Sequence, residues 1–253
     1  MHFPNLARLV LIEARRGGLP WLAAGAVLLC LGVAAFLSQV ALTESRELQL
    51  ATVAALARAC AVFLIAAQVA SSVLREIDDK GLELMLALPL SRPAHYLGRL
   101  AGFVACAAAL AAFFALPLLL WAQPAAVLMW AASLALELAL VAAASLFFAL
   151  SLGRLVPAIA GVLGLYLLAR SMAAIRTIAD SPLADAGFAH DVARWGVEGV
   201  ALVLPRLDAV TRTEWLLYGP PDGRAYVAAL AGLVIYGALL VAAGLFDFQR
   251  ASL

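Results

Sequence analysis

Six long apolar stretches constrain this chain more than any other feature of its sequence. A helix that crosses the hydrocarbon core of a bilayer needs about 20 mostly apolar residues, and each stretch is close to that length or longer. The stretches are Leu19–Leu42, Ala51–Leu74, Leu97–Trp121, Ala125–Leu152, Val156–Ala174 and Ala225–Phe246. The whole chain is 66% hydrophobic and 13% charged, which is about half the charge of a typical soluble domain. The sequence therefore predicts a multi-pass membrane protein.

The predicted fold class is an all-α membrane protein. Lipid offers no hydrogen-bond partners to the backbone, so only helices and closed barrels can span a bilayer. The apolar stretches lack the alternating pattern of barrel strands. We therefore expect a domain of six transmembrane helices over residues 19–253. Gly161, Gly164, Gly232 and Gly237 are candidates for close helix contacts.

Residues 1–18 form a separate predicted element. Arg8, Arg15 and Arg16 lie off its apolar stripe, and Gly17 with Gly18 ends it. The stripe repeats at the 3.6-residue period of a helix and consists of Phe3, Leu6, Ala7, Val10, Leu11 and Ala14. We expect an interfacial amphipathic helix on the inner membrane surface, with its arginines at the headgroups. The alternative is a simple cytoplasmic lead-in to the first span.

The basic residues near the spans predict the orientation of the protein. With the N-terminus inside, the short outer loops carry only Arg46. The inner segments then carry Arg8, Arg15, Arg16, Arg75, Lys80, Arg92, Arg99, Arg154 and Arg250. Both termini are therefore expected in the cytoplasm. An extended extracytoplasmic loop, residues 177–224, precedes the last span, and within it Gly196–Leu204 is expected to dip into the interface or pack on the outer mouth of the bundle.

A charged cytoplasmic segment, residues 75–96, separates the second and third spans. Read as a helix, it places Leu82, Met85 and Leu86 on one face and turns Glu83 away. An apolar face with charged flanks suits a groove on a partner protein. The residues assigned to this docking element are Glu76, Asp79, Gly81, Leu82, Glu83, Met85, Leu86, Pro89 and Arg92. The alternative is a loop that only covers the inner end of the bundle.

The run "REIDDKGLELMLALPLSRPAHYLGRL" resembles the signature of ABC-2-type permeases, the membrane subunits of bacterial ATP-binding-cassette exporters. Arg99 stands where that family usually has lysine. The resemblance implies that the segment is the coupling element contacting the ATPase, with two ATPase subunits per complex. It also implies a second permease copy or a related permease beside this one, and a location in the bacterial inner membrane.

The sequence predicts no catalytic, nucleotide, metal or nucleic-acid site of its own. A P-loop requires a lysine followed by serine or threonine, but the sole lysine, Lys80, is followed by Gly81. ATP and Mg²⁺ are therefore expected on the partner ATPase, with no cofactor on this chain. No HExxH, GxSxG or Cys/His ligand spacing occurs, so we expect no enzyme. A net charge of +1 excludes bulk attraction to nucleic acid.

Glu137 lies near the middle of the fourth predicted span. A carboxylate facing lipid costs a few kcal/mol or more, about 3 on insertion scales, so we expect Glu137 to face the bundle interior. It could line a substrate route or a permease–permease interface, or bond a neighbouring helix as a structural group. Arg58 is the obvious counter-ion, but it lies about one turn nearer the outer end. Outward snorkelling of Arg58 is therefore favoured over direct pairing.

Other functions stay open at this point. Within the exporter class, the chain could resemble the permeases for copper-site maturation or the haem-exporter-like cytochrome-assembly subunits. It could instead be a non-transporting membrane anchor for a cytoplasmic partner. A membrane enzyme would use Glu137 with an outer-loop group such as His190 or Asp191. The apolar walls specify no substrate.

The topology yields the first prediction. Single cysteines at Asp79 and Asp185, placed in a cysteine-free background, should react with membrane-impermeant reagents from opposite sides. The reason is that an odd number of spans separates the two positions in the six-span arrangement. Labelling of both positions from one side would contradict that arrangement.

Overall fold

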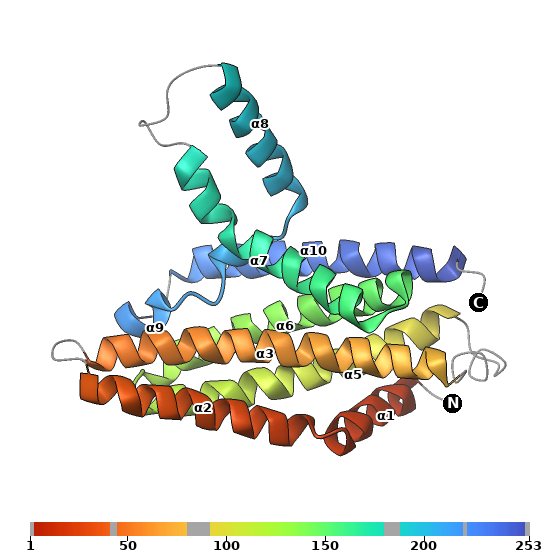
Figure 1. The fold of residues 1–253 in the computed structure, drawn as a ribbon, viewed down its shortest axis with the longest axis horizontal. Coiled ribbons are helices and arrows are strands. Elements are labelled where there is room, and N and C mark those ends of the chain that lie inside the picture. Colours follow the sequence, from red (N-terminus) through yellow and green to blue (C-terminus); the bar gives the residue numbers. More distant parts are fainter. Residues whose placement is uncertain (1–2, 41–44, 80–91, 180–187, 220–221, 251–253) are drawn as a thin grey trace.

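The computed structural model describes residues 3–40, 45–79, 92–179, 188–219 and 222–250 (Figure 1). Within these residues the chain forms helices and no strand. The α-helices are α1 (Phe3–Arg16), α2 (Leu19–Val40), α3 (Ser45–Asp78), α5 (Arg92–Ala115), α6 (Pro124–Leu152), α7 (Leu155–Ala179), α8 (Phe188–Val203), α9 (Glu214–Tyr218) and α10 (Gly223–Arg250). Two short 3₁₀ turns, η1 (Leu116–Leu120) and η2 (Leu207–Ala209), complete them.

Six of these helices are long and apolar enough to cross a membrane: α2, α3, α5, α6, α7 and α10. The predicted all-α architecture and its six candidate spans are thereby confirmed. α3 extends beyond the predicted stretch at both ends, because its flanking polar residues continue the helix. α6 begins at Pro124 and ends at Leu152, and the following Gly153 is a left-handed C-cap with a φ of 62°, which suits glycine.

α6 is the central helix of the bundle. It packs against α3, α5, α7 and α10, and it is the most buried of the six candidate spans. α2, α3, α5, α6 and α10 run side by side along the long axis of the molecule (Figure 1). We call the end of the bundle that carries α1 and the last turn of α10 the near end, and the end that carries α9 the far end.

α7 departs from the bundle. It starts at the near end, runs obliquely across α6, and its second half leaves the bundle together with α8 as a projecting hairpin (Figure 1). Gly196–Leu204 forms mostly the second half of α8, which packs along α7. Its expected place at the membrane interface or the outer mouth stays a prediction. The following segment, which includes η2 and α9, is the part that packs on the bundle, through α7, α3 and α6.

α1 folds back against α5 through two glycines. A Cβ atom on Gly102 would lie 2.7 Å from the Val10 Cβ and 3.0 Å from the Ala7 carbonyl oxygen. A Cβ on Gly98 would lie 2.9 Å from a Leu6 methyl group. Part of the predicted apolar stripe, including Leu6 and Val10, is therefore buried against α5. The Gly98-x-x-x-Gly102 spacing allows this close approach because it exposes backbone on one face of α5.

The predicted glycine contacts are only partly observed. Gly161 lies close to the Phe148 ring, whereas a Cβ on Gly164 or Gly232 would meet nothing within 4 Å. Spacing alone does not distinguish these positions from Gly102, since each lies within an apolar helix.

Gly102→Ala should therefore destabilise the protein by about 1–3 kcal/mol, the usual cost of overpacking. The new methyl group would meet the α1 backbone, which has little room to move. Gly232→Ala is the matched control, because it adds the same group to a helix at an open position. We expect a lower melting temperature in detergent for Gly102→Ala only. Equal melting temperatures for the two variants would contradict the close packing of α1 on α5.

Candidate functional site

A cleft of about 590 Å³ opens at the near end between α1, α3 and α5. Leu6, Leu9, Val10 and Ile12 form its apolar wall. Its polar and charged lining residues are Glu13, Arg16, Ser72, Arg75, Glu76, Asp79, His95 and Arg99. The cleft thus lies beside both ends of residues 80–91, because α3 leads into that segment and α5 follows it.

Arg99 is the centre of a charge network in this cleft. Its guanidinium forms an ion pair with Glu76 and donates a hydrogen bond to the Ser72 Oγ at 3.0 Å. The Ser72 hydroxyl in turn donates to a Glu13 carboxylate oxygen at 2.9 Å. Arg99 is only 7% exposed and lies against the Phe103 ring. Removing one partner from such a buried set costs about 3–5 kcal/mol, so the network fixes α1, α3 and α5 to one another.

The network contains only part of the docking element predicted from the sequence. Glu76 pairs with Arg99, and Asp79 lines the cleft. Arg92 lies at the start of α5 and contacts the Gln249 carbonyl of α10 at 3.4 Å. The remaining predicted residues, Gly81, Leu82, Glu83, Met85, Leu86 and Pro89, lie outside the described residues.

A second polar cluster surrounds Glu137 in the bundle interior. The Glu137 side chain is 0% exposed, as expected for a carboxyl group that avoids lipid. Tyr166 of α7 donates a hydrogen bond to its Oε1 at 2.8 Å, and Arg170, one turn further along α7, lies 3.7 Å from the same oxygen. Glu137 Oε2 has no hydrogen-bond partner among the described residues.

Arg170 also holds the segment between α8 and α9. Its guanidinium donates to the carbonyl oxygens of Leu207 at 2.5 Å, Val210 at 2.8 Å and Thr211 at 3.1 Å. Val210 and Thr211 lie outside the helices, so their carbonyls need partners from side chains, whereas the Leu207 carbonyl in η2 also accepts the Val210 N–H at 3.3 Å. Thr211 is buried and has a φ of 51°, an uncommon conformation for a β-branched residue. Arg170 therefore stabilises the strained connection between α8 and α9, which packs against α7.

Arg58 joins this cluster through the same connection. It donates to the Thr211 carbonyl at 2.9 Å, and no ion pair links it to Glu137 within the described part of the chain. The cation paired with Glu137 is Arg170. In the sequence, Arg170 is only one of two arginines near the end of the fifth predicted span. The Tyr166–Arg170 spacing on one helix face was the signal available for it.

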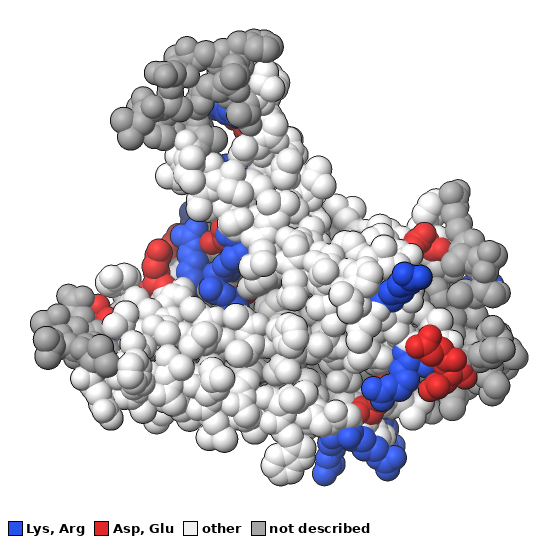
Figure 2. Space-filling model, viewed as in Figure 1, with Lys and Arg blue, Asp and Glu red and all other residues white. Residues whose placement is uncertain are grey.

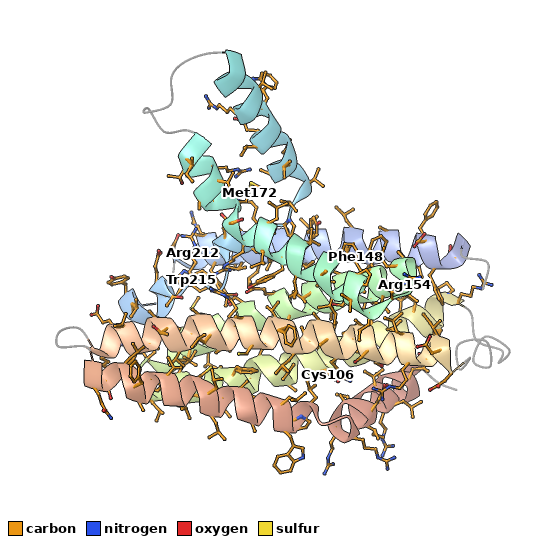
Figure 3. All side chains as sticks on the ribbon, viewed as in Figure 1. Cys106, Phe148, Arg154, Met172, Arg212 and Trp215 are labelled. Atoms are coloured by element: carbon orange, nitrogen blue, oxygen red, sulfur yellow. The ribbon has the colours of Figure 1, made fainter. Side chains whose placement is uncertain are left out.

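The charges are concentrated in these two regions. In Figure 2, arginine and acidic side chains gather in the recess between the projecting hairpin and the bundle, and again at the near end, while apolar and neutral atoms cover most of the surface between them. Figure 3 labels Met172 on α7, and Arg212 and Trp215 in the segment that follows α8. Arg212 donates to the Asp208 carbonyl at 3.0 Å, which braces the same connection from within.

The other candidate chemistries concern a metal site and the outer loop. The described residues contain no group of three or more His, Cys, Asp or Glu side chains that could hold a metal. His190 and Asp191, the alternative outer-loop groups, belong to α8, and their side chains lie outside the described residues. No model of a protein family and no curated protein matches the chain. The functional interpretation therefore rests on its own residues.

The contacts of Glu137 predict how its variants behave. Glu137→Gln should be tolerated, because the amide oxygen still accepts the Tyr166 hydrogen bond. Glu137→Leu should cost about 1–3 kcal/mol, since it leaves the buried Tyr166 hydroxyl without its partner. Tyr166→Phe should then cost less when added to the Glu137→Leu variant than when added to the wild type. Melting temperatures of the single and double variants measure this coupling, and equal stability of wild type, Glu137→Gln and Glu137→Leu would mean that the carboxyl group has no structural partner.

Proposed function

We propose that this chain is the transmembrane permease subunit of an ABC-2-type transporter. It would form the substrate route with a second permease copy or a related permease, and two separate ATPase subunits would drive it. The complex would lie in a bacterial inner membrane with both termini of this chain in the cytoplasm. Residues 75–96 would be the coupling segment, and residues 177–224 the extracytoplasmic loop.

The observation that carries the proposal is the charge network at the near end. Glu76 and Arg99 flank the predicted coupling residues on α3 and α5, and they bind each other directly. Ser72 and Glu13 extend the network to α1. A force applied to residues 80–91 would therefore act on three helices together. A loop that merely covers the bundle has no need of so costly a buried network.

The cleft offers a seat for part of an ATPase surface. It has an apolar wall from α1 and charged residues from α3 and α5. Apolar contact supplies most of the affinity at such a surface, whereas charged rims mainly set register and association rate. This division agrees with the pattern of residues 75–96, in which Leu82, Met85 and Leu86 share a face and acidic residues flank it.

Transport would follow from two arrangements of the bundle with different affinity for the closed ATPase dimer. Nucleotide binding to the partner would favour one arrangement by differential contacts at the coupling segment. α3 would transmit the change, because it carries Ser72 and Glu76 near one end and Arg58 near the other. The hydrolysis itself would belong to the partner, since this sequence holds no P-loop.

Met85→Asp combined with Leu86→Ser should abolish co-purification of the ATPase. Burying such side chains contributes about 1.5–3 kcal/mol each, so their loss should weaken docking about a hundredfold or more. The variant should still insert and remain monodisperse by size exclusion, because neither residue belongs to a predicted span. The readouts are the ATPase retained on the affinity-purified permease and its stimulated hydrolysis.

Glu83→Gln is the matched control for that experiment. Glu83 lies on the opposite face of the predicted helix, where an exposed ion pair contributes about 0–1 kcal/mol, so this variant should keep its ATPase. A double variant that retains both the ATPase and its stimulated hydrolysis would show that the segment only covers the bundle, and would refute the proposed coupling role.

A further inference from the structure

A separate apolar slot opens on the side of the bundle where α1, α2 and α5 meet. Its volume is about 320 Å³, at the lower end of the range for small-ligand pockets. Arg15 is its one charged lining residue, and the rest of its lining is apolar. α1 contributes Leu11 to this lining, and α2 contributes Leu19.

The shape of the slot suits a hydrocarbon chain. Along α5 it extends from Cys106 to Phe113, about 10 Å at 1.5 Å per residue. Its floor is made of buried small or apolar side chains, among them Ala14, Ala23 and Cys106. Water in such a slot would find almost no hydrogen-bond partners. An acyl chain would bury apolar surface against three helices at once.

The mouth of the slot carries uncompensated positive charge. Arg15 and Arg16 end α1, and both are exposed with no ion-pair partner among the described residues. The neighbouring acid, Glu13, is engaged by Ser72 on the other side of the helix. Figure 2 shows arginine side chains projecting from the lower edge of the molecule, where α1 meets α2. This charge complements a phosphate group.

The surroundings match the depth at which a lipid headgroup lies. Trp21, in the first turn of α2, is 83% exposed, and tryptophan is enriched where membrane meets water. α2 is itself a candidate span that begins at Leu19. The slot therefore extends from the start of a span toward its middle, with Arg15 at the headgroup side and Phe113 at the hydrocarbon side.

We propose that this slot binds one acyl chain of an anionic phospholipid whose phosphate is held by Arg15. Arg16 adds to the local positive potential. The lipid would bridge α1, α2 and α5 beside the turn at Gly17 and Gly18, where Gly18 has a φ of 87°. It would thereby fix the angle between α1 and the first span. This site is independent of the coupling segment and of the proposed transport function.

The test uses the full-length protein, delipidated in detergent, and measures lipid binding by native mass spectrometry. Phosphatidylglycerol and phosphatidylcholine with identical acyl chains are titrated separately. We expect phosphatidylglycerol to bind about tenfold more tightly, because only its headgroup is anionic. Arg15→Gln should reduce that preference to near zero. Arg154→Gln, which removes an exposed arginine elsewhere at the near end, should leave it unchanged.

A second pair of variants tests the slot itself. Ala109 is exposed and lines the slot, so Ala109→Trp should fill it and weaken both lipids at least about tenfold. Ala108→Trp adds the same group at the neighbouring exposed position, outside the slot, and should have no such effect. Monodispersity of each variant by size exclusion confirms that it has folded.

Three results would overturn the proposal. Equal affinity for the two lipids would show that Arg15 does not select an anionic headgroup. Equal effects of Ala108→Trp and Ala109→Trp would indicate general lipid contact with the bundle surface. Displacement of phosphatidylglycerol by equimolar free glycerol phosphate would indicate a phosphate site without an acyl chain.

Discussion

The structure depends on one constraint: a polar group inside an apolar helical bundle must find its partner within the protein. Two polar clusters satisfy it. At the near end Arg99 binds Glu76 and Ser72, and in the interior Arg170 binds Glu137 and three backbone carbonyls. Each cluster joins helices that have only weak reasons to associate in lipid, where apolar surfaces gain little by meeting. The polar contacts therefore select the arrangement of helices within the bundle.

α3 is the element that connects the two clusters. Arg58 and Ser72 are fourteen residues apart on it, about 20 Å along a continuous helix. Displacement of α3 at the near end would therefore shift the Thr211 carbonyl that Arg58 and Arg170 share. In the proposed transporter, this would be a direct mechanical route from residues 75–96 to the connection between α8 and α9. Close packing at Gly98 and Gly102 would make α1 move together with α3 and α5 at the same end.

The candidate sites were predictable from sequence only in part. The burial of Glu137 followed from the cost of a carboxyl group in lipid, and its position in an apolar stretch was visible. Its partner was not, because the sequence made Arg58 the obvious counter-ion, whereas the observed contact with Arg170 depends on how α7 crosses α6. Glu76 was assigned to the coupling segment from its position in the charged loop. Its pairing with Arg99 required the packing of α3 on α5, and the extension to Glu13 required the folding of α1 onto α5. No local pattern specifies either contact.

The sequence by itself determined that the chain is strongly apolar and where its long helices lie. Stretches of about 20 apolar residues are long enough to span a membrane, and the lack of backbone partners in lipid favours a helix for each stretch. These consequences are local and need no knowledge of neighbours. The tertiary structure decided which faces meet. It placed Gly102 against α1 while leaving Gly232 open, and turned α7 out of the bundle to pair with α8. Helix contacts between apolar surfaces depend on shape and on a few polar partners far apart in the chain, so composition and periodicity leave them undetermined.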